Sequence, residues 1–355
     1  MIGSFVHQAL PMRVVFGAGS RAAVREEVDR LALSRVLVLC SPGRSGLGEE
    51  IAEGLGDRAV GVLAQARMHV PVELARRARQ LAVDVGADGC VAVGGGSAIG
   101  LGKAIALEIG LPVVAVPTTY SGSEMTPVWG LTEAGRKRTG RDERVLPRTV
   151  VYDPELTVGL PPDVSATSGI NAIAHAAEAL YAPDATPIVA ALAVDGVRAL
   201  AGALPRVVAD GTDIDARTDA LCGSWLCGIT LATATMSLHH KLCHALGGTL
   251  DLPHAATHTV VLPYVLGYNR SAAPDAAAAL SRALGGTPDP VRALWDLTGA
   301  LGAPRSLREL GMAETDVDRI VDEVVAATFP NPRPVTADGL RGLLLGAWAG
   351  RPPWD

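Results

Sequence analysis

Residues 89–119 read GCVAVGGGSAIGLGKAIALEIGLPVVAVPTT, and their pattern is the clearest structural signal in the chain. Two short apolar runs, Cys90–Val93 and Pro112–Val116, are predicted strands, and an apolar helical pattern over Ala98–Ile109 separates them. A strand–helix–strand order predicts a parallel βαβ unit with a right-handed crossover. The chain is therefore expected to contain an α/β domain built on a parallel sheet.

A loop of three glycines and a serine, Gly94–Ser97, joins the first strand to this helix. Glycine lets backbone amides approach an anion closely, and the positive end of the helix dipole favours a pyrophosphate. The following strand leads into a polar loop at the sheet edge where α/β proteins bind ligands. We therefore predict a dinucleotide site, with candidate contacts at Ser41, Gly95, Gly96, Ser97, Thr118, Thr119 and Ser121.

Neither the Gly-x-Gly-x-x-Gly fingerprint nor Walker spacing is present in the sequence. The alternative interpretation of the glycine loop is a tight strand-to-helix turn in which Ser97 caps the helix. No acidic residue directly follows the predicted strand Arg35–Cys40. A carboxylate there would bind the ribose hydroxyls and repel a 2'-phosphate, so its absence predicts that either NADH or NADPH is accepted.

The alternation of strands and helices extends through the first part of the chain, with a further strand at Val60–Leu63 and an amphipathic helix over Pro71–Val85. After about Pro161 the pattern becomes Ala-rich and helical, without a convincing strand. Residues 1–160 are predicted to form the α/β domain and residues 161–355 an all-helical domain. The helices expected there cover Ser165–Tyr181, Pro187–Leu204, Asp215–Thr233 and Ser237–Gly247.

Composition excludes several classes of protein. The net charge of -6 and the lack of a basic run argue against a nucleic-acid partner. The N-terminus lacks the pattern of a signal peptide, and no uninterrupted apolar segment reaches the roughly 18 residues of a membrane span. The five cysteines form no disulfide or Cys-x-x-Cys pattern. A cytoplasmic protein with reduced thiols and no membrane partner is the expectation.

Six of the eight histidines lie between residues 171 and 258. Asn171 and His175 are four residues apart, as are His240 and His244, so each pair shares one face of a helix. His254 follows a probable turn. Imidazoles converging from different helices suit a metal centre, but Asn171 is a neutral amide where a hard cation prefers a carboxylate. The alternative is a set of core imidazoles.

The remaining two histidines of this stretch, His239 and His258, are interpreted as incidental. Together with the two loops at Gly94–Ser97 and Pro117–Thr119, the other residues of this stretch resemble a known family, the iron-containing (group III) alcohol dehydrogenases, and within them the maleylacetate reductases. The shared pattern is the Gly-Gly-Gly-Ser loop, a Pro-Thr-Thr loop, an Asp-x-x-x-His motif and two further histidines fourteen residues apart. In this chain the pattern corresponds to Gly94–Ser97, Pro117–Thr119, Asn171 with His175, and His240 with His254.

Two positions depart from the metal-dependent members of that family. Gly100 and Asn171 stand where those enzymes carry aspartate, and both departures are typical of the maleylacetate reductases. The resemblance implies a Rossmann-like dinucleotide-binding domain followed by a helical domain, a fold related to that of dehydroquinate synthase. It also implies reduction of the conjugated double bond of maleylacetate to 3-oxoadipate, with NADH or NADPH, in the degradation of aromatic compounds.

Hydride can add to a double bond conjugated to a ketone without a metal, provided that the enolate oxygen is stabilised and a proton is delivered. We therefore expect no required metal. His244 is the candidate proton donor or oxyanion partner, and His175, His240 and His254 are the other candidate catalytic residues. Arg or Lys is expected to bind the substrate carboxylates. Candidate substrate contacts are Asn171, Tyr120 and Arg148, with Lys137, Arg138 and Arg141 as further cations in the same stretch.

Three other functions compete with this prediction. The first is a metal-dependent alcohol or glycerol dehydrogenase acting on a small hydroxy compound. The second is a lyase like dehydroquinate synthase, which would retain its NAD without net consumption. The third is a catalytically silent protein that binds a nucleotide. A small dicarboxylate substrate and a homodimer are expected from the resemblance.

Overall fold

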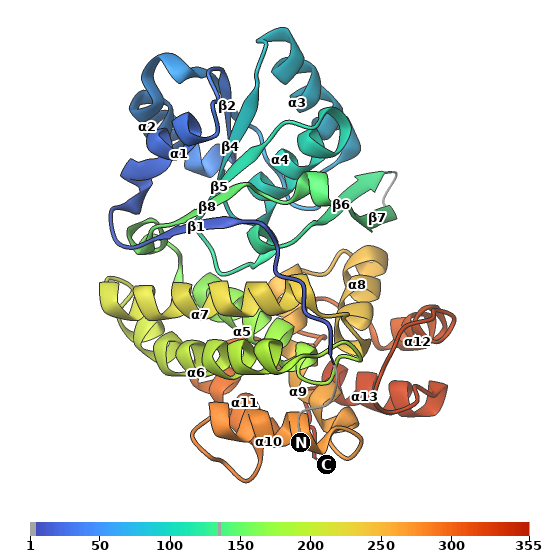
Figure 1. Ribbon diagram of the computed structural model, residues 1–355. Helices are drawn as coiled ribbons and strands as arrows, with labels where there is room; N and C mark the ends of the chain where they lie inside the picture. The colour runs from blue at the N-terminus through green and yellow to red at the C-terminus, as the bar shows by residue number, and fades with distance from the viewer. Residues whose placement is uncertain (1–4, 134–135, 355) are drawn as a thin grey trace. The chain divides into compact units, whose positions relative to one another are not determined.

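The computed structural model describes residues 5–133 and 136–354 (Figure 1). The chain divides into two compact units. One unit comprises Ala9–Leu160, and the other comprises the chain from Pro161 onward together with the segment before Ala9. The predicted first domain began at residue 1, whereas Phe5–Gln8 belong to the helical unit. One local contact explains this, because His7 Nδ1 lies 3.3 Å from Thr186 Oγ1.

The α/β unit contains a six-stranded sheet in the order β1-β8-β5-β4-β2-β3, and all neighbouring strands are parallel. Because the strands are parallel, their carboxyl ends all lie at one edge of the sheet. This order confirms the predicted parallel sheet. The strands are β1 (Arg13–Phe16), β2 (Val36–Cys40), β3 (Ala59–Ala64), β4 (Gly89–Gly94), β5 (Val113–Pro117) and β8 (Thr149–Tyr152).

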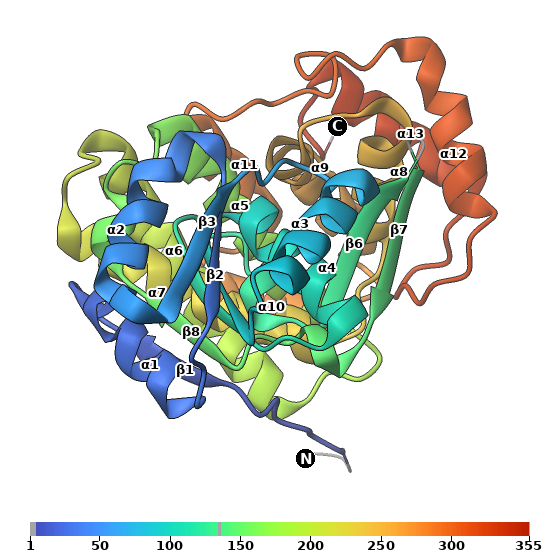
Figure 2. The ribbon, with the colours of Figure 1, turned by 90° about the horizontal axis from the view of Figure 1, so that it is seen from above.

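Helices cover both faces of this sheet (Figure 2). On one face, α1 (Val24–Arg30) and α2 (Ser45–Leu55) pack on valines of the central strands. On the other lie α3 (Val72–Asp84) and α4 (Gly96–Ile109). Strands buried on both faces need apolar residues at every position, which is why β2 reads VLVLC without alternation.

A two-stranded antiparallel hairpin, formed by β6 (Val128–Glu133) and β7 (Arg136–Arg141), lies outside this sheet. The sequence analysis named no strand in this segment, whose charged second half lacks the apolar alternation of a half-buried strand. Arg138 is exposed and pairs with Glu133 at 3.5 Å. The side chain of Lys137 lies outside the described residues.

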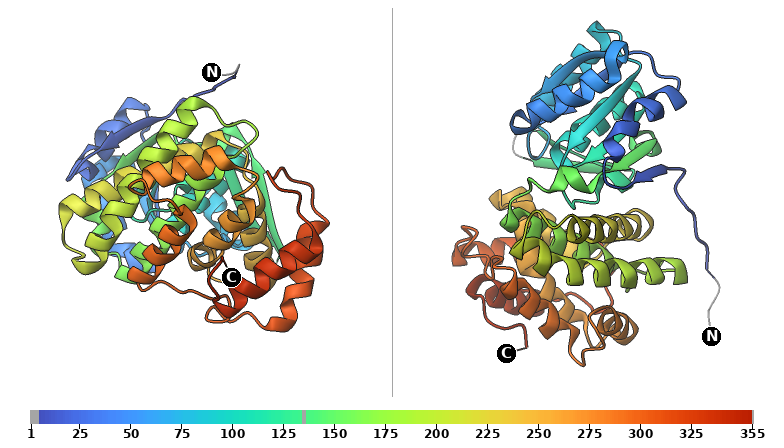
Figure 3. Two further views of the ribbon diagram at one scale, coloured as in Figure 1. Left: turned by 90° about the horizontal axis from the view of Figure 1, so that it is seen from below. Right: turned by 90° about the vertical axis from the view of Figure 1, so that its left-hand side faces the viewer.

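The second unit is helical, as predicted. Its first helices, α5, α6 and α7, lie side by side (Figure 1, Figure 3). A core of apolar residues from α8, α9, α12 and α13 fills the other part of the unit. The helices are α5 (Pro162–Ala179), α6 (Pro187–Ala209), α7 (Ile214–Thr233), α8 (Leu238–Leu250), α9 (His254–Asn269), α10 (Pro274–Ala283), α11 (Pro290–Ala300), α12 (Val317–Val325) and α13 (Ala337–Ala349).

The helices α6 and α7 approach each other at two glycines. A Cβ atom on Gly223 would lie 3.0 Å from the backbone oxygen of Gly196 and 2.9 Å from Leu200 Cγ. By length and composition alone, α6 could cross a membrane; in the structure it packs against α5 and α7 within the helical unit.

Gly223→Ala is expected to lower the free energy of unfolding by about 1–3 kcal/mol, because the added methyl group meets backbone that cannot move independently. Gly202→Ala on α6 is the matched control, since a Cβ atom there has nothing within 4 Å. The control should be neutral or stabilising by roughly 0.5–1 kcal/mol. Urea denaturation measures both, and equal values would contradict the close approach of the two helices.

Candidate functional site

The glycine loop lies at the carboxyl end of β4 and leads directly into α4. Gly95 is the N-cap of that helix, and Gly94 has φ 142°, a conformation that favours glycine. Thr118 N donates to the Gly94 oxygen at 3.1 Å, which joins the loops after β4 and β5. A Cβ atom on Gly95 would lie 2.9 Å from Thr119 Cγ2, so only glycine allows this threonine to pack against the loop.

The predicted cofactor residues follow three adjacent strands. Ser41 follows β2, the glycine loop with Ser97 follows β4, and Thr118 to Ser121 follow β5. Because β2, β4 and β5 are parallel neighbours, these residues share one edge of the sheet. Thr119 Oγ1 is buried and has no hydrogen-bond partner among the described residues. A buried hydroxyl of this kind is a candidate ligand contact.

A buried lysine connects α4 to the loop that follows β5. Lys103 Nζ donates to the backbone oxygens of Ser123, Thr126 and Val128 at 2.6, 2.7 and 2.8 Å, and Thr126 Oγ1 lies 3.0 Å away. Burial lowers the pKa of Lys103 to about 7, and nearby Glu124 opposes that shift. Three backbone oxygens and two hydroxyl groups, including Ser123 Oγ at 3.5 Å, nevertheless surround the nitrogen, and only the ammonium form has three hydrogens to offer them.

A second buried polar group, Glu124, lies in the same loop. Its carboxylate accepts hydrogen bonds from Tyr152 Oη at 2.8 Å and from Ser121 Oγ at 3.3 Å. Burial raises the pKa of Glu124. The sequence analysis identified neither Lys103 nor Glu124. The available signal was a single lysine within an otherwise apolar helix.

The first turns of α4 also pack against a turn with unusual backbone angles. His69 and Val70 have φ of 61° and 42°, a region that β-branched residues seldom adopt. Val70 is buried, and its Cγ2 atom lies 2.8 Å from where a Cβ atom on Gly100 would be. Val70 therefore fills the space that a side chain at position 100 would need, including the aspartate of the metal-dependent enzymes that the sequence analysis described.

The histidine cluster is assembled from three helices. Asn171 and His175 lie on α5, His240 and His244 on α8, and His254 at the start of α9. The ring centroids of His175 and His240 are 5.2 Å apart. The exposed His244 ring lies 6.2 Å from that of His240 and stacks at 6.4 Å from that of His254. The structure thus brings the predicted histidines together.

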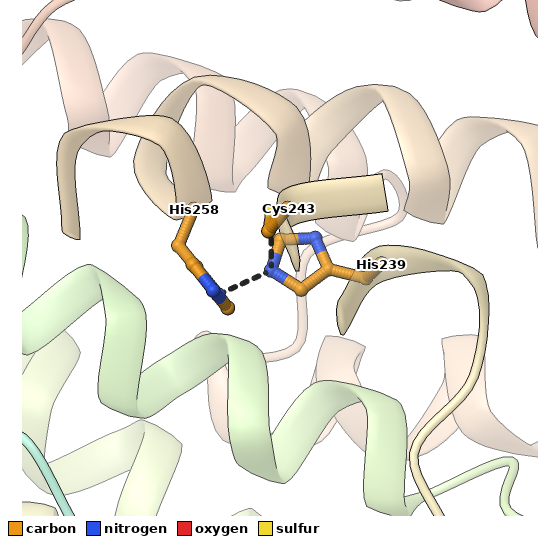
Figure 4. Close-up of side chains that lie close together, drawn as sticks. All are labelled: His239, Cys243 and His258. Carbon is orange, nitrogen blue, oxygen red and sulfur yellow. Dashed lines mark hydrogen bonds between the residues drawn. The ribbon is translucent and has the colours of Figure 1, made fainter. Parts of the chain in front are cut away.

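The structure also places His239 and His258, which the sequence analysis interpreted as incidental, in the histidine cluster. His258 lies in the middle of the cluster, with its ring centroid 4.3 Å from that of His254 and 5.0 Å from that of His240. His239 Nε2 is 2.9 Å from His258 Nδ1, and Cys243 Sγ is 3.8 Å from the same His239 atom (Figure 4). The spacing of four residues between His254 and His258 was the missed signal.

Among residues 5–133 and 136–354, one group of histidine, cysteine or acidic side chains has its ligand atoms close enough together to share a metal ion. This group is the trio of His239, Cys243 and His258. Its N–N distance of 2.9 Å is that of a hydrogen bond. Burial lowers the pKa of His239 to about 3. We interpret the pair of rings as neutral and hydrogen-bonded to each other.

In this trio, His239 Nδ1 and His258 Nε2 have no hydrogen-bond partner among the described residues, and the same is true of a second set of potential ligand atoms. Asn171 Oδ1, His175 Nδ1 and His240 Nε2 are buried without a hydrogen-bond partner in the described part of the chain. Burial and the neighbouring histidines hold the pKa of His175 well below its usual value, so its ring is neutral. Neutral imidazoles and an amide oxygen are ligands that a divalent transition metal accepts. The residues present therefore fit a metal, with Asn171 as a weaker ligand than aspartate.

Two of the predicted substrate contacts, Tyr120 and Arg148, lie in different surroundings. Tyr120 is fully buried, as expected of a packing residue. Arg148 N donates to the Val113 oxygen at 2.8 Å, at the amino end of β5. Because β5 runs from Val113 to Pro117, Val113 marks its amino end and Thr118 follows its carboxyl end. Arg148 therefore lies at the amino edge of the sheet, opposite to the edge that carries Thr118. The position of Arg148 is thus unfavourable for the predicted contact, whereas Tyr120 follows β5 at the carboxyl edge and stays a prediction. Spacing alone could not reveal the edge to which Arg148 belongs.

Comparison with known proteins agrees with this geometry. The model of the iron-containing alcohol dehydrogenases matches residues 11–154, and the model of the C-terminal part of the Fe-containing alcohol dehydrogenase family matches residues 165–348. The maleylacetate reductase of Burkholderia cepacia is 52% identical over 352 residues, which cover 99% of this chain and 100% of the relative.

Solved structures give the same result. The maleylacetate reductase from Agrobacterium tumefaciens superimposes with a TM-score of 0.95 and 49% identity, covering 99% of this chain and 100% of that chain. The enzyme of the same name from Rhizobium sp. gives a TM-score of 0.94 and 50% identity, over 98% and 99% of the two chains. The resemblance inferred from the motifs is thereby confirmed. The chain belongs to the iron-containing alcohol dehydrogenase family, and within it to the group of the maleylacetate reductases.

Proposed function

We propose that this protein reduces the carbon–carbon double bond of maleylacetate to give 3-oxoadipate, with NADH or NADPH as the hydride donor. The main support is identity of about half of the residues over the whole chain with maleylacetate reductases. Gly100 and Asn171 add support from the site itself, because both replace the aspartates of the metal-dependent relatives.

The cofactor is proposed to bind at the carboxyl edge of the sheet. The backbone amides of Gly95 to Ser97, at the start of α4, would hold the pyrophosphate. The hydroxyl of Thr119, which has no partner within residues 5–133 and 136–354, lies beside that loop and is available to a further cofactor oxygen. Ser41 follows β2 at the position where an acidic residue would exclude NADPH, so both cofactors are expected to bind.

The substrate is proposed to bind beside the histidine cluster. Hydride forms a new C–H bond at the β-carbon, and the π electrons move to the ketone oxygen, giving an enolate and the oxidised cofactor. A proton added to the α-carbon then restores the ketone. His244 is the proposed proton donor because its exposed imidazole can exchange protons with water. The other imidazoles are proposed to contact the substrate oxygens.

Asn171, His175, His240 and His254 are the residues that would hold a metal, and a metal bound there would act as a Lewis acid on the ketone oxygen. We propose that the reduction does not depend on it. The conjugated ketone already accepts the hydride electrons. The amide of Asn171 also gives the site one anionic ligand fewer than the metal-dependent members of the family have.

The test is the decrease of NADH absorbance with maleylacetate, measured before and after treatment with a chelator. Turnover that survives chelation is the expected result. Absence of turnover would contradict the proposed substrate. Loss of turnover on chelation, with recovery on adding zinc or iron, would instead support the second candidate chemistry, metal-dependent dehydrogenation. That chemistry is favoured by Asn171 Oδ1 and His240 Nε2, potential metal ligands without a hydrogen-bond partner among the described residues.

His244→Ala is expected to lower kcat by roughly 10²–10⁴-fold, because it removes the proposed proton donor. The Kd for NADH, measured by fluorescence titration, should not change. His7→Ala is a control for the loss of a histidine outside the cluster. Equal losses of kcat and NADH affinity in His244→Ala would show that its role is misassigned.

A further inference from the structure

Glu178 is a buried carboxylate beside the histidine cluster. It lies on α5 three residues after His175, and only 1% of the residue is exposed. Its Oε2 atom is 2.5 Å from His240 Nδ1. Its Oε1 atom accepts from the backbone N–H of His239 at 2.7 Å, and Oε2 also accepts from that of His240 at 3.3 Å. One carboxylate thus contacts both the backbone and a ring of α8.

The backbone contacts place Glu178 at the N-terminus of α8, which begins at Leu238. The first N–H groups of a helix have no partner within the helix, and the positive end of its dipole favours an anion. The residue at the N-cap, Ser237, makes no side-chain cap hydrogen bond. Glu178 therefore caps α8 from a neighbouring helix, and the two N–H donors hold the carboxylate in a fixed orientation.

The ring contact has a consequence for the chemistry of His240. An ionised carboxylate only accepts hydrogen bonds, so the proton of the short contact must be on His240 Nδ1. In a neutral imidazole the other nitrogen, Nε2, then carries the lone pair. That Nε2 atom is buried and has no hydrogen-bond partner in the described part of the chain. It belongs to the same set of unsatisfied atoms as Asn171 Oδ1.

We propose that Glu178 is a positioning residue for His240: it holds the ring as the Nδ1–H tautomer and directs Nε2 toward the ligand of the histidine cluster. This inference rests on the proposed function for its effect on turnover. Carboxylates that accept from the remote N–H of a histidine commonly fix its orientation and tautomer. In the neighbouring His239, Nε2 is hydrogen-bonded to His258 Nδ1, and Nδ1 has no hydrogen-bond partner among the described residues.

Glu178→Gln separates this role from simple capping of α8. The glutamine oxygen, at the place of Oε1, can still accept from the backbone N–H of His239, and only the longer contact from the His240 N–H at 3.3 Å is lost. The glutamine amide can then turn its NH₂ group toward His240 Nδ1, which stabilises the opposite tautomer, with the proton on Nε2. The variant is therefore expected to fold and to bind NADH with a Kd within about twofold of the parent, while kcat falls by about 10–100-fold.

The decisive measurement is the ¹⁵N NMR spectrum of the histidine rings, with His240→Gln used to assign the signals of His240. The parent should show a strongly deshielded Nδ1–H proton, and Glu178→Gln should show the proton on Nε2. Glu323→Gln is the matched control. It removes an exposed carboxylate on α12 that accepts a hydrogen bond from Thr249 Oγ1, and it should change neither the histidine spectrum nor kcat.

Several outcomes would overturn the inference. An Nε2–H signal for His240 in the parent would do so without any variant, even if Glu178→Gln fails to fold. A purely structural role predicts a lower Tm for Glu178→Gln, with the His240 tautomer and kcat unchanged. If the parent does not reduce maleylacetate, the proposed function fails, whereas the parent spectrum still reports on the Glu178–His240 contact.

Discussion

Lys103→Met is expected to lower the free energy of unfolding by about 3–5 kcal/mol, the usual cost of removing one member of a buried charged network. Methionine fills a similar volume but donates no hydrogen bond. The backbone oxygens of Ser123, Thr126 and Val128 would then remain buried without their donor. Glu124 would lose the nearby positive charge that favours its ionised form. Urea denaturation at neutral pH gives the value.

The same variant is expected to weaken NADH binding by about tenfold, about 1.4 kcal/mol. The loop held by Lys103 continues from Thr118 and Thr119, and its Ser121 hydroxyl is bonded to Glu124. Lys241→Met is the control, because it removes a lysine of α8 that is not fully buried and should change stability by less than about 0.5 kcal/mol. A variant that unfolds more easily but binds NADH normally would show that Lys103 stabilises the fold without shaping the cofactor loop.

Local pattern was sufficient to predict most of the fold. The strands β2, β4 and β5 are continuous apolar runs between turn signals, and the helices α5 to α8 follow long Ala-rich patterns. The strand β8 was missed because it has only four residues, too few to show a clear pattern of apolar residues, and it follows a charged segment. Its place between β1 and β5 depends on pairing with distant parts of the chain, which no local pattern reports.

The site was predictable where it depends on spacing within one helix. Asn171 with His175 and His240 with His244 were identified because residues four apart share a helix face. The contact between Glu178 and His240 depends instead on how α5 packs against α8. Burial of Lys103 likewise depends on where the loop after β5 runs. Pattern within single elements carries no information on such packing.

Asn171→Asp is expected to increase the affinity of the cluster for zinc by at least about tenfold, or 1.4 kcal/mol. Asn171 Oδ1 is buried beside neutral imidazoles and lacks a hydrogen-bond partner among the described residues, as a potential metal ligand would. An ionised carboxylate at this position adds a charge that attracts the cation, whereas the amide contributes only a dipole. Isothermal titration of the metal-free protein with zinc measures the difference.

Stability provides an independent readout of the same substitution. Without metal, the new carboxylate is buried with no cation beside it, so the metal-free variant should have a lower Tm than the parent. Zinc should then raise the Tm of the variant more than that of the parent, because ligand binding to the folded state stabilises it in proportion to affinity.

Asn269→Asp is the matched control for that measurement. Asn269 is also buried in the helical unit, but its amide is paired with that of Asn331. A carboxylate there should lower the Tm without any recovery on adding zinc. The same response to zinc in both variants would show that position 171 is not a ligand position. A tighter metal site in Asn171→Asp with no gain in maleylacetate turnover would separate metal affinity from hydride transfer in this chain.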